Sequence, residues 1–420
     1  MNLHAGVKVE AGSRPDRYDG PPVTPTPPPR NRRDYVPALG YASFTFVGWN
    51  ALLVPSLVPS IERDFAQPDA GMGVFYFITA LLFVIGSLVG GYVMERVGRG
   101  RALPAAVFGM AAGLACEAFA PSWAIFVVGG ALAGFGSGAV EVGMNALFLD
   151  RFSEDRGRAL SRLHLCFSIG ALAAPLVIAA LVEIGVAWRL PFAVTSLVVV
   201  AIGLGLATSE LGVPHAASAS RVGRPAVGRH VPLPLVLLAV AITSYVAAES
   251  GVSSWLVRFL DTAPIGVATL ALSLFWAGLA LGRLVASRVA DRFAPMSVVT
   301  ACGLAAGAAI LAAVVVPWIG VSIALFALAG VACGPIYPMI VASAGALYPT
   351  RANAVSGVLT AAAVTGSVVY PPAMGLVSNG LGLGVGMAGA GLFAVVCAGA
   401  MVGARLLARA NLHANVKVVA

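Results

Sequence analysis

Apolar residues run through most of the chain in stretches of about 20, and short polar segments separate one stretch from the next. A helix needs about 20 apolar residues to cross the hydrocarbon core of a bilayer, so each stretch predicts one transmembrane helix. The runs are 36–58, 71–94, 102–120, 123–149, 160–183, 188–208, 233–258, 266–288, 296–317, 319–347, 353–377 and 382–405. The pattern therefore predicts an all-α polytopic membrane protein with twelve transmembrane helices.

The polar segments that flank these runs divide the chain. Residues 1–34 are rich in proline and lack the short apolar segment and cleavage site of a signal peptide, so we expect a disordered cytoplasmic tail. The longest internal polar segment, 209–232, is basic and rich in small residues, which indicates a cytoplasmic linker. It separates two predicted six-helix bundles, 35–208 and 233–408, and residues 409–420 form a second predicted cytoplasmic tail.

The composition agrees with a membrane protein. Hydrophobic residues make up 59% of the chain, charged residues only 10%, and the mean hydropathy is +0.91. The net charge is +8, but the arginines lie in separate turns and form no single patch, so no nucleic-acid partner is expected. The five cysteines lie inside apolar runs without metal-ligand spacing, and the sequence has no Ser/His/Asp set or phosphate-binding loop. We therefore expect no metal, no cofactor and no enzymatic activity.

The arginines also predict the orientation of the helices. Most of the arginines in loops lie on one side of the twelve runs: Arg96, Arg99, Arg101, Arg151, Arg156, Arg158, Arg162, Arg221, Arg224, Arg229, Arg288, Arg292 and Arg351. The opposite side has Arg63, Arg189 and Arg258. Because cytoplasmic loops carry the excess of arginine and lysine, both termini are predicted in the cytoplasm, with the chain crossing the cytoplasmic membrane many times.

Several landmarks of the first half return in the second half at a constant spacing of 196 residues. The pairs are Glu95-Arg96 and Asp291-Arg292, Gly134 and Gly330, Gly138 and Gly334, Gly170 and Gly366, and Pro175 and Pro371. A shared spacing indicates a duplicated bundle, so we expect two pseudo-symmetric halves with a substrate site near the membrane midplane between them.

The segment "GYVMERVGRGR" at 91–101 resembles the signature of the major facilitator superfamily between its second and third helices, with a glutamate where that family has aspartate. The resemblance implies the major facilitator fold, a monomeric transporter and a loop whose charges lock one conformation. The loop residues that it implies are Gly91, Glu95, Arg96, Gly98 and Arg99, together with Asp291 and Arg292 in the second half.

Other segments are similar to the fucose permease-like sugar/proton symporters of that superfamily. They are "EVGMN" at 141–145, "YVAAESGVSSWL" at 245–256 and "GRLVASRVADRFAP" at 282–295. That group also carries an acidic residue in its first span, where this chain has "WNALLVPSLVP" and Asn50 is the nearest polar group. The departure weakens the expectation of two coupling carboxylates.

Glu141 is the candidate proton carrier, because a charge at membrane depth costs at least about 2.5–3.5 kcal/mol and the protonated form avoids that cost. The alternative is a structural carboxyl held by a neighbouring helix. His164 is a candidate relay because histidine titrates near physiological pH, with an interfacial or core histidine as the alternative. Glu117, near the end of the third run, is expected to be interfacial and without a transport role.

The candidate substrate-binding residues are Asn50, Asn145, Tyr245, Glu249 and Tyr337. Amides and a carboxyl can bind hydroxyl groups, and aromatic faces suit sugar rings. Asn145 could instead orient Glu141, one turn earlier on the same helix face. The alternatives for Glu249 and for the aromatics are interhelical hydrogen bonding and packing. The segment "SGVSS" after Glu249 predicts local unwinding of its helix.

These residues favour a secondary transporter of a small polar solute, with proton-coupled sugar symport as the leading interpretation. The expected partners are the substrate, protons and the lipid bilayer. A drug/proton efflux antiporter is the first alternative, although the fifth run lacks the G-P-x-x-G-G-like motif of such antiporters. A receptor or sensor that kept only the fold is the second, and the paired loop charges argue against it.

Overall fold

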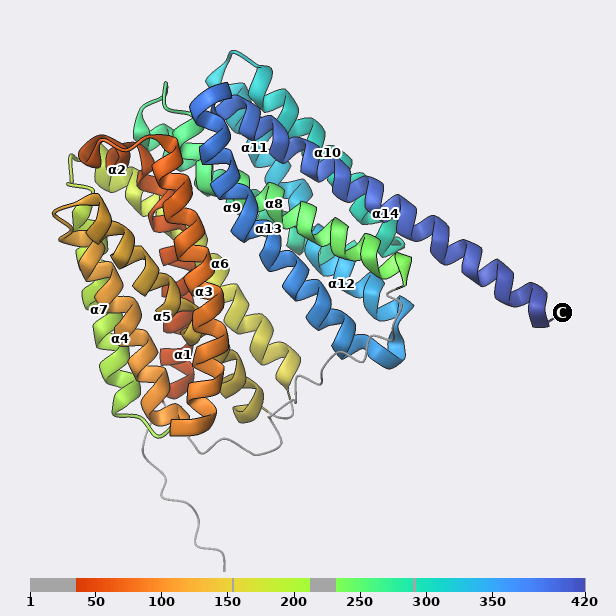
Figure 1. Cartoon of the computed structure of the whole chain (residues 1–420), viewed down its shortest axis with the longest axis horizontal. Coiled ribbons are helices and arrows are strands. Elements are labelled where there is room, and N and C mark those ends of the chain that lie inside the picture. Colours follow the sequence, from red (N-terminus) through yellow and green to blue (C-terminus); the bar gives the residue numbers. More distant parts are fainter. Residues whose placement is uncertain (1–34, 153–154, 212–231, 290–291, 420) are drawn as a thin grey trace, which may run out of the picture. The chain divides into compact units, whose positions relative to one another are not determined.

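The computed structural model describes residues 35–152, 155–211, 232–289 and 292–419, and these residues form helices and no strand. Residues 1–34 and most of the predicted linker at 209–232 lie outside this part of the chain. Two groups of helices follow one another along the sequence (Figure 1). We call α1–α7 the first half and α8–α14 the second half.

The first half begins with α1 (Val36–Leu53), the 3-10 turn η1 (Pro55–Leu57) and α2 (Val58–Phe65). It continues with α3 (Asp69–Val97), α4 (Arg99–Ala118), α5 (Trp123–Arg151), α6 (Arg156–Glu183) and α7 (Arg189–Ala207). The second half contains α8 (Leu233–Phe259), α9 (Ile265–Val289), α10 (Pro295–Val315), α11 (Ile319–Cys333), α12 (Ile336–Leu347), the turn η4 (Pro349–Arg351), α13 (Ala352–Leu381) and α14 (Leu383–Val419).

Eleven helical segments of the described chain are long and apolar enough to cross a membrane. The predicted span at 102–120 is not among them, because α4 carries Arg99, Arg101 and Glu117, which lower its hydropathy. Its 20 residues are nevertheless long enough, and it packs between α5 and α7. Its counterpart α10 packs against α11 and α14 in the same way, so α4 occupies the place of the twelfth helix.

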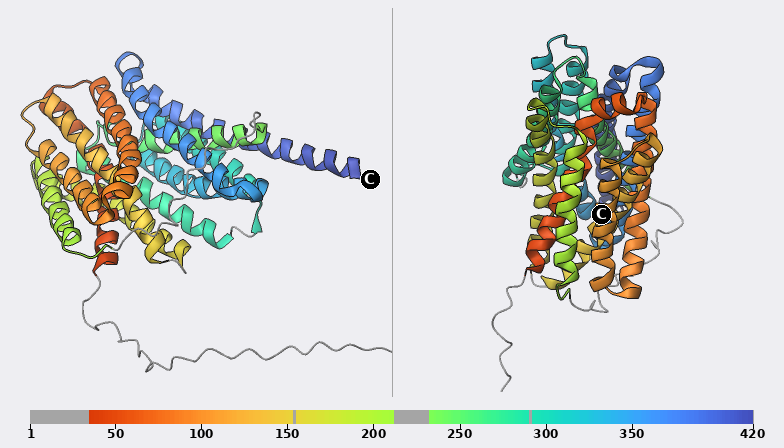
Figure 2. Two further views of the ribbon diagram at one scale, coloured as in Figure 1. Left: turned by 60° about the horizontal axis from the view of Figure 1, so that its bottom comes forward. Right: turned by 90° about the vertical axis from the view of Figure 1, so that its left-hand side faces the viewer.

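Two predicted spans are longer than expected. The first was predicted to end at residue 58, but the helix resumes after η1 and continues to Phe65. Pro55 has no backbone N–H for the helical ladder, which accounts for the short 3-10 turn between α1 and α2. The last span was predicted to end at 405, whereas α14 continues to Val419 and extends beyond the other helices (Figure 2).

The two halves repeat the same glycine contacts. In the first half, Gly134 lies against the backbone oxygen of Thr79, and Gly138 against that of Phe83. The equivalent contacts in the second half join Gly330 to Phe275 and Gly334 to Leu279, each residue 196 positions later. Glycine permits this close approach because a Cβ atom would collide with the facing carbonyl. The predicted pseudo-symmetry therefore extends to individual backbone contacts.

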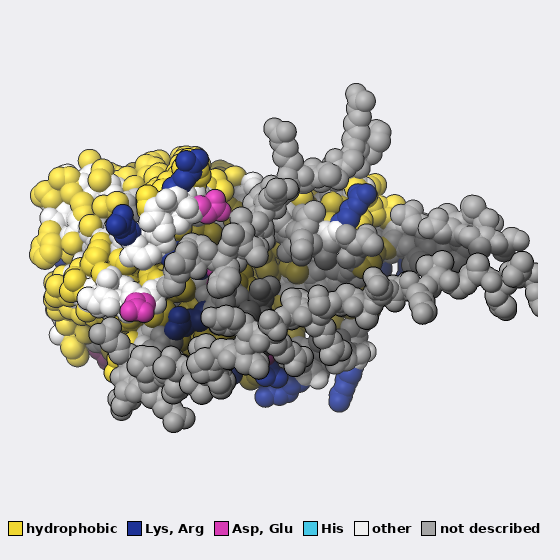
Figure 3. All heavy atoms as spheres, turned by 90° about the horizontal axis from the view of Figure 1, so that it is seen from below, with side chains coloured by type: hydrophobic (Ala, Val, Ile, Leu, Met, Phe, Trp, Pro, Cys, Tyr) yellow, Lys and Arg dark blue, Asp and Glu magenta, His cyan; other side chains and the backbone are white. Residues whose placement is uncertain are grey.

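Arginine side chains are spread over the face seen from below in Figure 3. Arg96, Arg101 and Arg162 have exposed side chains in the loops and helix ends that were predicted to be cytoplasmic. We call this the Arg99 end of the helices, after the ion pair in which Arg99 bonds Asp150 at 2.6 Å.

Candidate functional site

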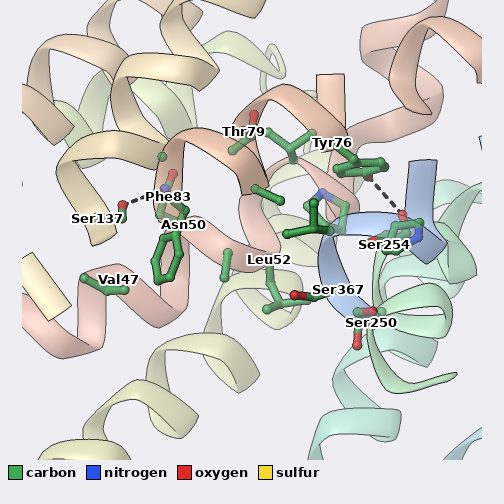
Figure 4. Close-up of a pocket in the computed structure, with 18 of the residues that line it drawn as sticks. Val47, Asn50, Leu52, Tyr76, Thr79, Phe83, Ser137, Ser250, Ser254 and Ser367 are labelled. Carbon is green, nitrogen blue, oxygen red and sulfur yellow. Dashed lines mark hydrogen bonds between the residues drawn. The ribbon is translucent and has the colours of Figure 1, made fainter. Parts of the chain in front are cut away.

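A cavity of about 470 Å³ lies between the two halves. Side chains from α1, α3, α4, α5 and α6 line one wall, and side chains from α8, α9 and α13 line the other. Figure 4 shows Asn50 and Ser137 on the first wall, with Ser250, Ser254 and Ser367 on the second.

The first wall is built on the small-residue face of α5. Gly130, Gly134 and Ser137 succeed one another at three- and four-residue spacing, so they share one face of the helix. Asn50 of α1 donates a hydrogen bond from Nδ2 to Ser137 Oγ at 3.3 Å. Thr79 of α3 also lines the cavity, and its hydroxyl oxygen is buried without a hydrogen-bond partner.

The second wall is rich in hydroxyl groups. The Ser250 hydroxyl donates to the Val246 carbonyl one turn earlier, at 2.6 Å, whereas the buried Ser253 hydroxyl has no partner. Trp276 of α9 brings an indole N–H that is also buried and unpartnered. The Ser253 hydroxyl and the Trp276 indole can therefore bind a polar ligand without first breaking a protein hydrogen bond.

Helix α8 is unbroken from Leu233 to Phe259, so the predicted unwinding after Glu249 is wrong. Gly251 instead permits close packing, because a Cβ atom there would lie 2.8 Å from the Tyr370 ring and from the Met374 sulfur. Trp255 further fixes α8 against α13 by donating from Nε1 to the Pro371 carbonyl at 2.8 Å.

Three carboxyl groups face the cavity, from Glu117, Glu141 and Glu249, and His164 lies there too. The described residues that line it include no lysine or arginine. Glu117 was expected to be interfacial, but only 1% of it is exposed. It was misjudged because its position near a helix end says nothing about which way its helix face points.

The structure brings four predicted site residues together, namely Asn50, Glu141, His164 and Glu249. No hydrogen bond or ion pair joins Glu141 to His164 in the described part of the chain, so a relay between them would need an intervening group. The His164 ring instead meets the Phe44 ring edge-on, with centroids 5.4 Å apart.

Asn145, Tyr245 and Tyr337 do not line the cavity. Asn145 lies one turn beyond Glu141 on α5, and its side-chain oxygen is buried without a partner. Tyr245 is 1% exposed and lies one turn before Glu249 on α8. Tyr337 is half-buried at the start of α12.

The residues of the predicted loop motif at the Arg99 end differ in how far they are buried. Gly98 joins α3 to α4 with a φ of 85°, a conformation that favours glycine. Arg99 is buried in its ion pair with Asp150, while Glu95 and Arg96 are exposed and Arg96 lies over the Tyr92 ring at 5.0 Å. A Cβ atom on Gly91 would meet open space and Arg292 is exposed, whereas Asp291 lies outside the described residues.

Sequence reasoning missed an ion-pair cluster at the opposite end, which we call the Arg258 end. Arg258 of α8 donates from Nε to Glu62 at 2.7 Å and to Asp69 at 2.9 Å, so it joins α2 and α3 to the second half. Ser378 of α13 also donates to Asp69. Acids and an arginine at the ends of apolar runs could have revealed this cluster.

Other hydrogen bonds between the halves lie on the same side of the cavity. Tyr76 donates to the Ser254 carbonyl at 3.0 Å (Figure 4), and Thr269 and Ser273 donate to the backbone of η1 and α6, each at 3.4 Å. The Arg258 end is therefore closed in this conformation.

The chain matches the Major Facilitator Superfamily over residues 38–319. It is 28% identical to the glucose/mannose transporter of Bacillus subtilis over 153 residues, which are 36% of this chain and 38% of that protein. It is 27% identical to the gentisate transporter of Corynebacterium glutamicum over 363 residues, which are 80% of each chain. The solved structure of a D-xylose–proton symporter superposes with a TM-score of 0.69 at 16% identity, over 87% of this chain and 96% of that one.

Proposed function

The chain belongs to the Major Facilitator Superfamily, and we propose that it moves a small uncharged polyhydroxy solute, a sugar, by proton-coupled symport. The cavity between the halves is the proposed substrate site. Alternating access would open its two ends in turn.

The chemistry of the cavity wall carries this proposal. Three carboxyls, several hydroxyls and an indole N–H face it, while no lysine or arginine does so among the described residues. An anionic solute would meet only like charge or neutral groups, and burying an unpaired charge is costly. A sugar can donate to carboxyl oxygens and accept from the indole. The wall therefore favours the substrate class of the Bacillus relative over an aromatic acid such as gentisate.

Glu141 is the proposed proton carrier. Its carboxyl faces the cavity and forms no ion pair in the described chain, so its protonated form is the less costly one in apolar surroundings. Binding of the sugar and of one proton together would permit the change of conformation. Glu249 and Asn50 would hold the sugar from opposite walls.

Uptake by proteoliposomes tests this function. With an inward proton gradient, the wild-type chain should accumulate radiolabelled D-glucose, and unlabelled gentisate should not compete. Glu141→Gln should lower the accumulation ratio at least about 50-fold at a driving force of about 100 mV, which is the contribution of one proton, but should retain the equilibration of D-glucose down its own gradient. Full accumulation by that variant would contradict the proposed proton carrier, and competition by gentisate would contradict the proposed substrate class.

Efflux of a lipophilic cation is the second candidate, because the same three carboxyls lie among aromatic side chains such as Phe75, Phe167 and Trp276. Such a ligand would pair with a carboxylate and stack on these rings. Tetraphenylphosphonium distinguishes the two candidates. If protons drive its export from loaded proteoliposomes while D-glucose is not moved, efflux replaces symport.

A further inference from the structure

Glu117 is a buried acid that the proposed mechanism does not yet use. It reaches the cavity from α4, while Glu141 reaches it from α5. A Cβ atom on Gly129 would lie 2.9 Å from Glu117 Cγ, so Glu117 lies level with Gly129 on α5. Twelve residues separate Gly129 from Glu141, which is about 18 Å along a helix. The two carboxyls therefore lie at opposite ends of the cavity, Glu117 toward the Arg258 end.

The surroundings of Glu117 provide no counter-charge. Its Oε2 atom is buried without a hydrogen-bond partner, and it forms no ion pair with any described residue. The nearest basic group on α7, Arg189, bonds Asp64 at 2.7 Å and the carbonyls of Ala118 and Ala120 at 3.3 and 2.8 Å.

The groups that adjoin Glu117 along α4 and across from it on α5 are uncharged. Cys116 precedes it on α4, and the Tyr76 hydroxyl of α3, which lines the same cavity, donates to the second half. Gly129 and Gly130 of α5 present no side chain beyond hydrogen. An ionised carboxylate left unpaired in such a site costs several kcal/mol, whereas a protonated carboxyl avoids most of that cost.

We propose that Glu117 is a second proton-binding carboxyl of the cavity and that it carries one proton per transport cycle alongside Glu141. This proposal rests on the proposed symport. Glu117 takes its proton from water when the Arg258 end is open and keeps it while that end closes. When the cavity then opens at the Arg99 end, its carboxyl O–H bond breaks and the proton passes to water on that side.

Infrared spectroscopy of the full chain tests the protonation directly and needs no substrate. The chain is placed in phosphatidylcholine–phosphatidylglycerol vesicles, and the C=O band of protonated carboxyls is recorded at about pH 7, where exposed glutamates are ionised. Glu117→Gln should remove part of this band. Glu183→Gln, which changes an exposed glutamate at the end of α6, should leave it unchanged. Glu117→Asp keeps a carboxyl at this position, so it should keep the band but shift its frequency. This second variant tests the proposal even if Glu117→Gln does not fold.

Accumulation of D-glucose tests the coupling. If each carboxyl carries one proton, Glu117→Gln lowers the maximum accumulation ratio about 50-fold at a driving force of about 100 mV per proton. Exchange of D-glucose should continue. An unchanged carboxyl band or an unchanged accumulation ratio in Glu117→Gln would overturn the proposal. In the second case the wild type would still accumulate D-glucose, so the proposed symport would stand. Failure of the wild type to accumulate D-glucose would overturn both.

Discussion

At the residue scale, the cavity holds polar atoms that are ready for a ligand. Thr79, Ser253 and Trp276 each bury a donor or acceptor that no protein group satisfies. A buried donor or acceptor without a hydrogen bond costs about 1–3 kcal/mol, so a ligand that bonds several of these groups recovers that energy on binding. The geometry suits a compact solute with hydroxyl groups in more than one direction.

Trp276→Phe should weaken the binding of D-glucose, because the indole donor is lost while an aromatic face remains. One neutral hydrogen bond contributes about 0.5–1.5 kcal/mol, so the expected loss of affinity is about 2–10-fold. Calorimetric titration of the purified protein measures it. Trp318→Phe is the matched control, since Trp318 is 69% exposed and lies outside the cavity. Equal affinities in both variants would remove Trp276 from the site.

Some of the residues that the sequence singled out line the cavity. Intramembrane acids and amides stand out against apolar runs, so Asn50, Glu141 and Glu249 could be found before the fold was known. The position of Tyr337 could not be predicted from the repeat. It is the equivalent of Glu141, but α5 is continuous there, whereas its counterpart breaks between α11 and α12 at Gly334 and Pro335. A proline removes a backbone N–H, and the helix after it need not keep the same face toward the cavity.

At the element scale, glycine decides how closely helices approach. The contacts of α5 with α3, and of α11 with α9, bring glycine against a facing backbone. The spacing of 196 residues predicted which glycines are equivalent, but only the packed helices show which backbone each one meets. Twelve spans were predictable because length and hydropathy are local properties, whereas the partners of each helix depend on the whole bundle.

Gly138→Ala should destabilise the protein, since the added methyl would collide with the Phe83 carbonyl across the α3–α5 contact. Overpacking of this kind costs about 1–3 kcal/mol. Thermal unfolding in detergent should show a lower midpoint temperature for this variant. Gly109→Ala is the control, because a Cβ atom at Gly109 in α4 would meet open space and alanine favours a helix. A midpoint unchanged by Gly138→Ala would show that α3 and α5 can separate without loss.

At the scale of the whole molecule, charge closes one end of the cavity. Glu62 and Asp69 from the first half share the guanidinium of Arg258 from the second, and both acids are largely buried. Opening this end separates the opposite charges, so the cluster stabilises the conformation seen here. Its partners are distant in sequence, which is why the pattern of apolar runs did not predict it.

Arg258→Gln should shift the population toward a conformation open at this end, because Glu62 and Asp69 would lose their counter-charge. A shift of about 1.4 kcal/mol corresponds to a tenfold change in the ratio of the two conformations. Spin labels placed on the two halves at the Arg258 end would report this shift as a distribution of label-to-label distances that moves to longer values. Arg189→Gln is the control, since Arg189 pairs with Asp64 inside the first half. Identical distributions for both variants would argue against Arg258 as a closing element.

The repeated glycine contacts have an evolutionary consequence. When a gene for one bundle is duplicated, both copies inherit the positions at which helices touch, and here those contacts survive in Gly134 and Gly330 and in Gly138 and Gly334. The side chains at other equivalent positions differ between the two halves. Glu141 in the first half, for example, corresponds to Tyr337 in the second. The two halves therefore carry different side chains at the level of Glu141 while they keep the same helix contacts, so the lining of the cavity can change without a change of the fold.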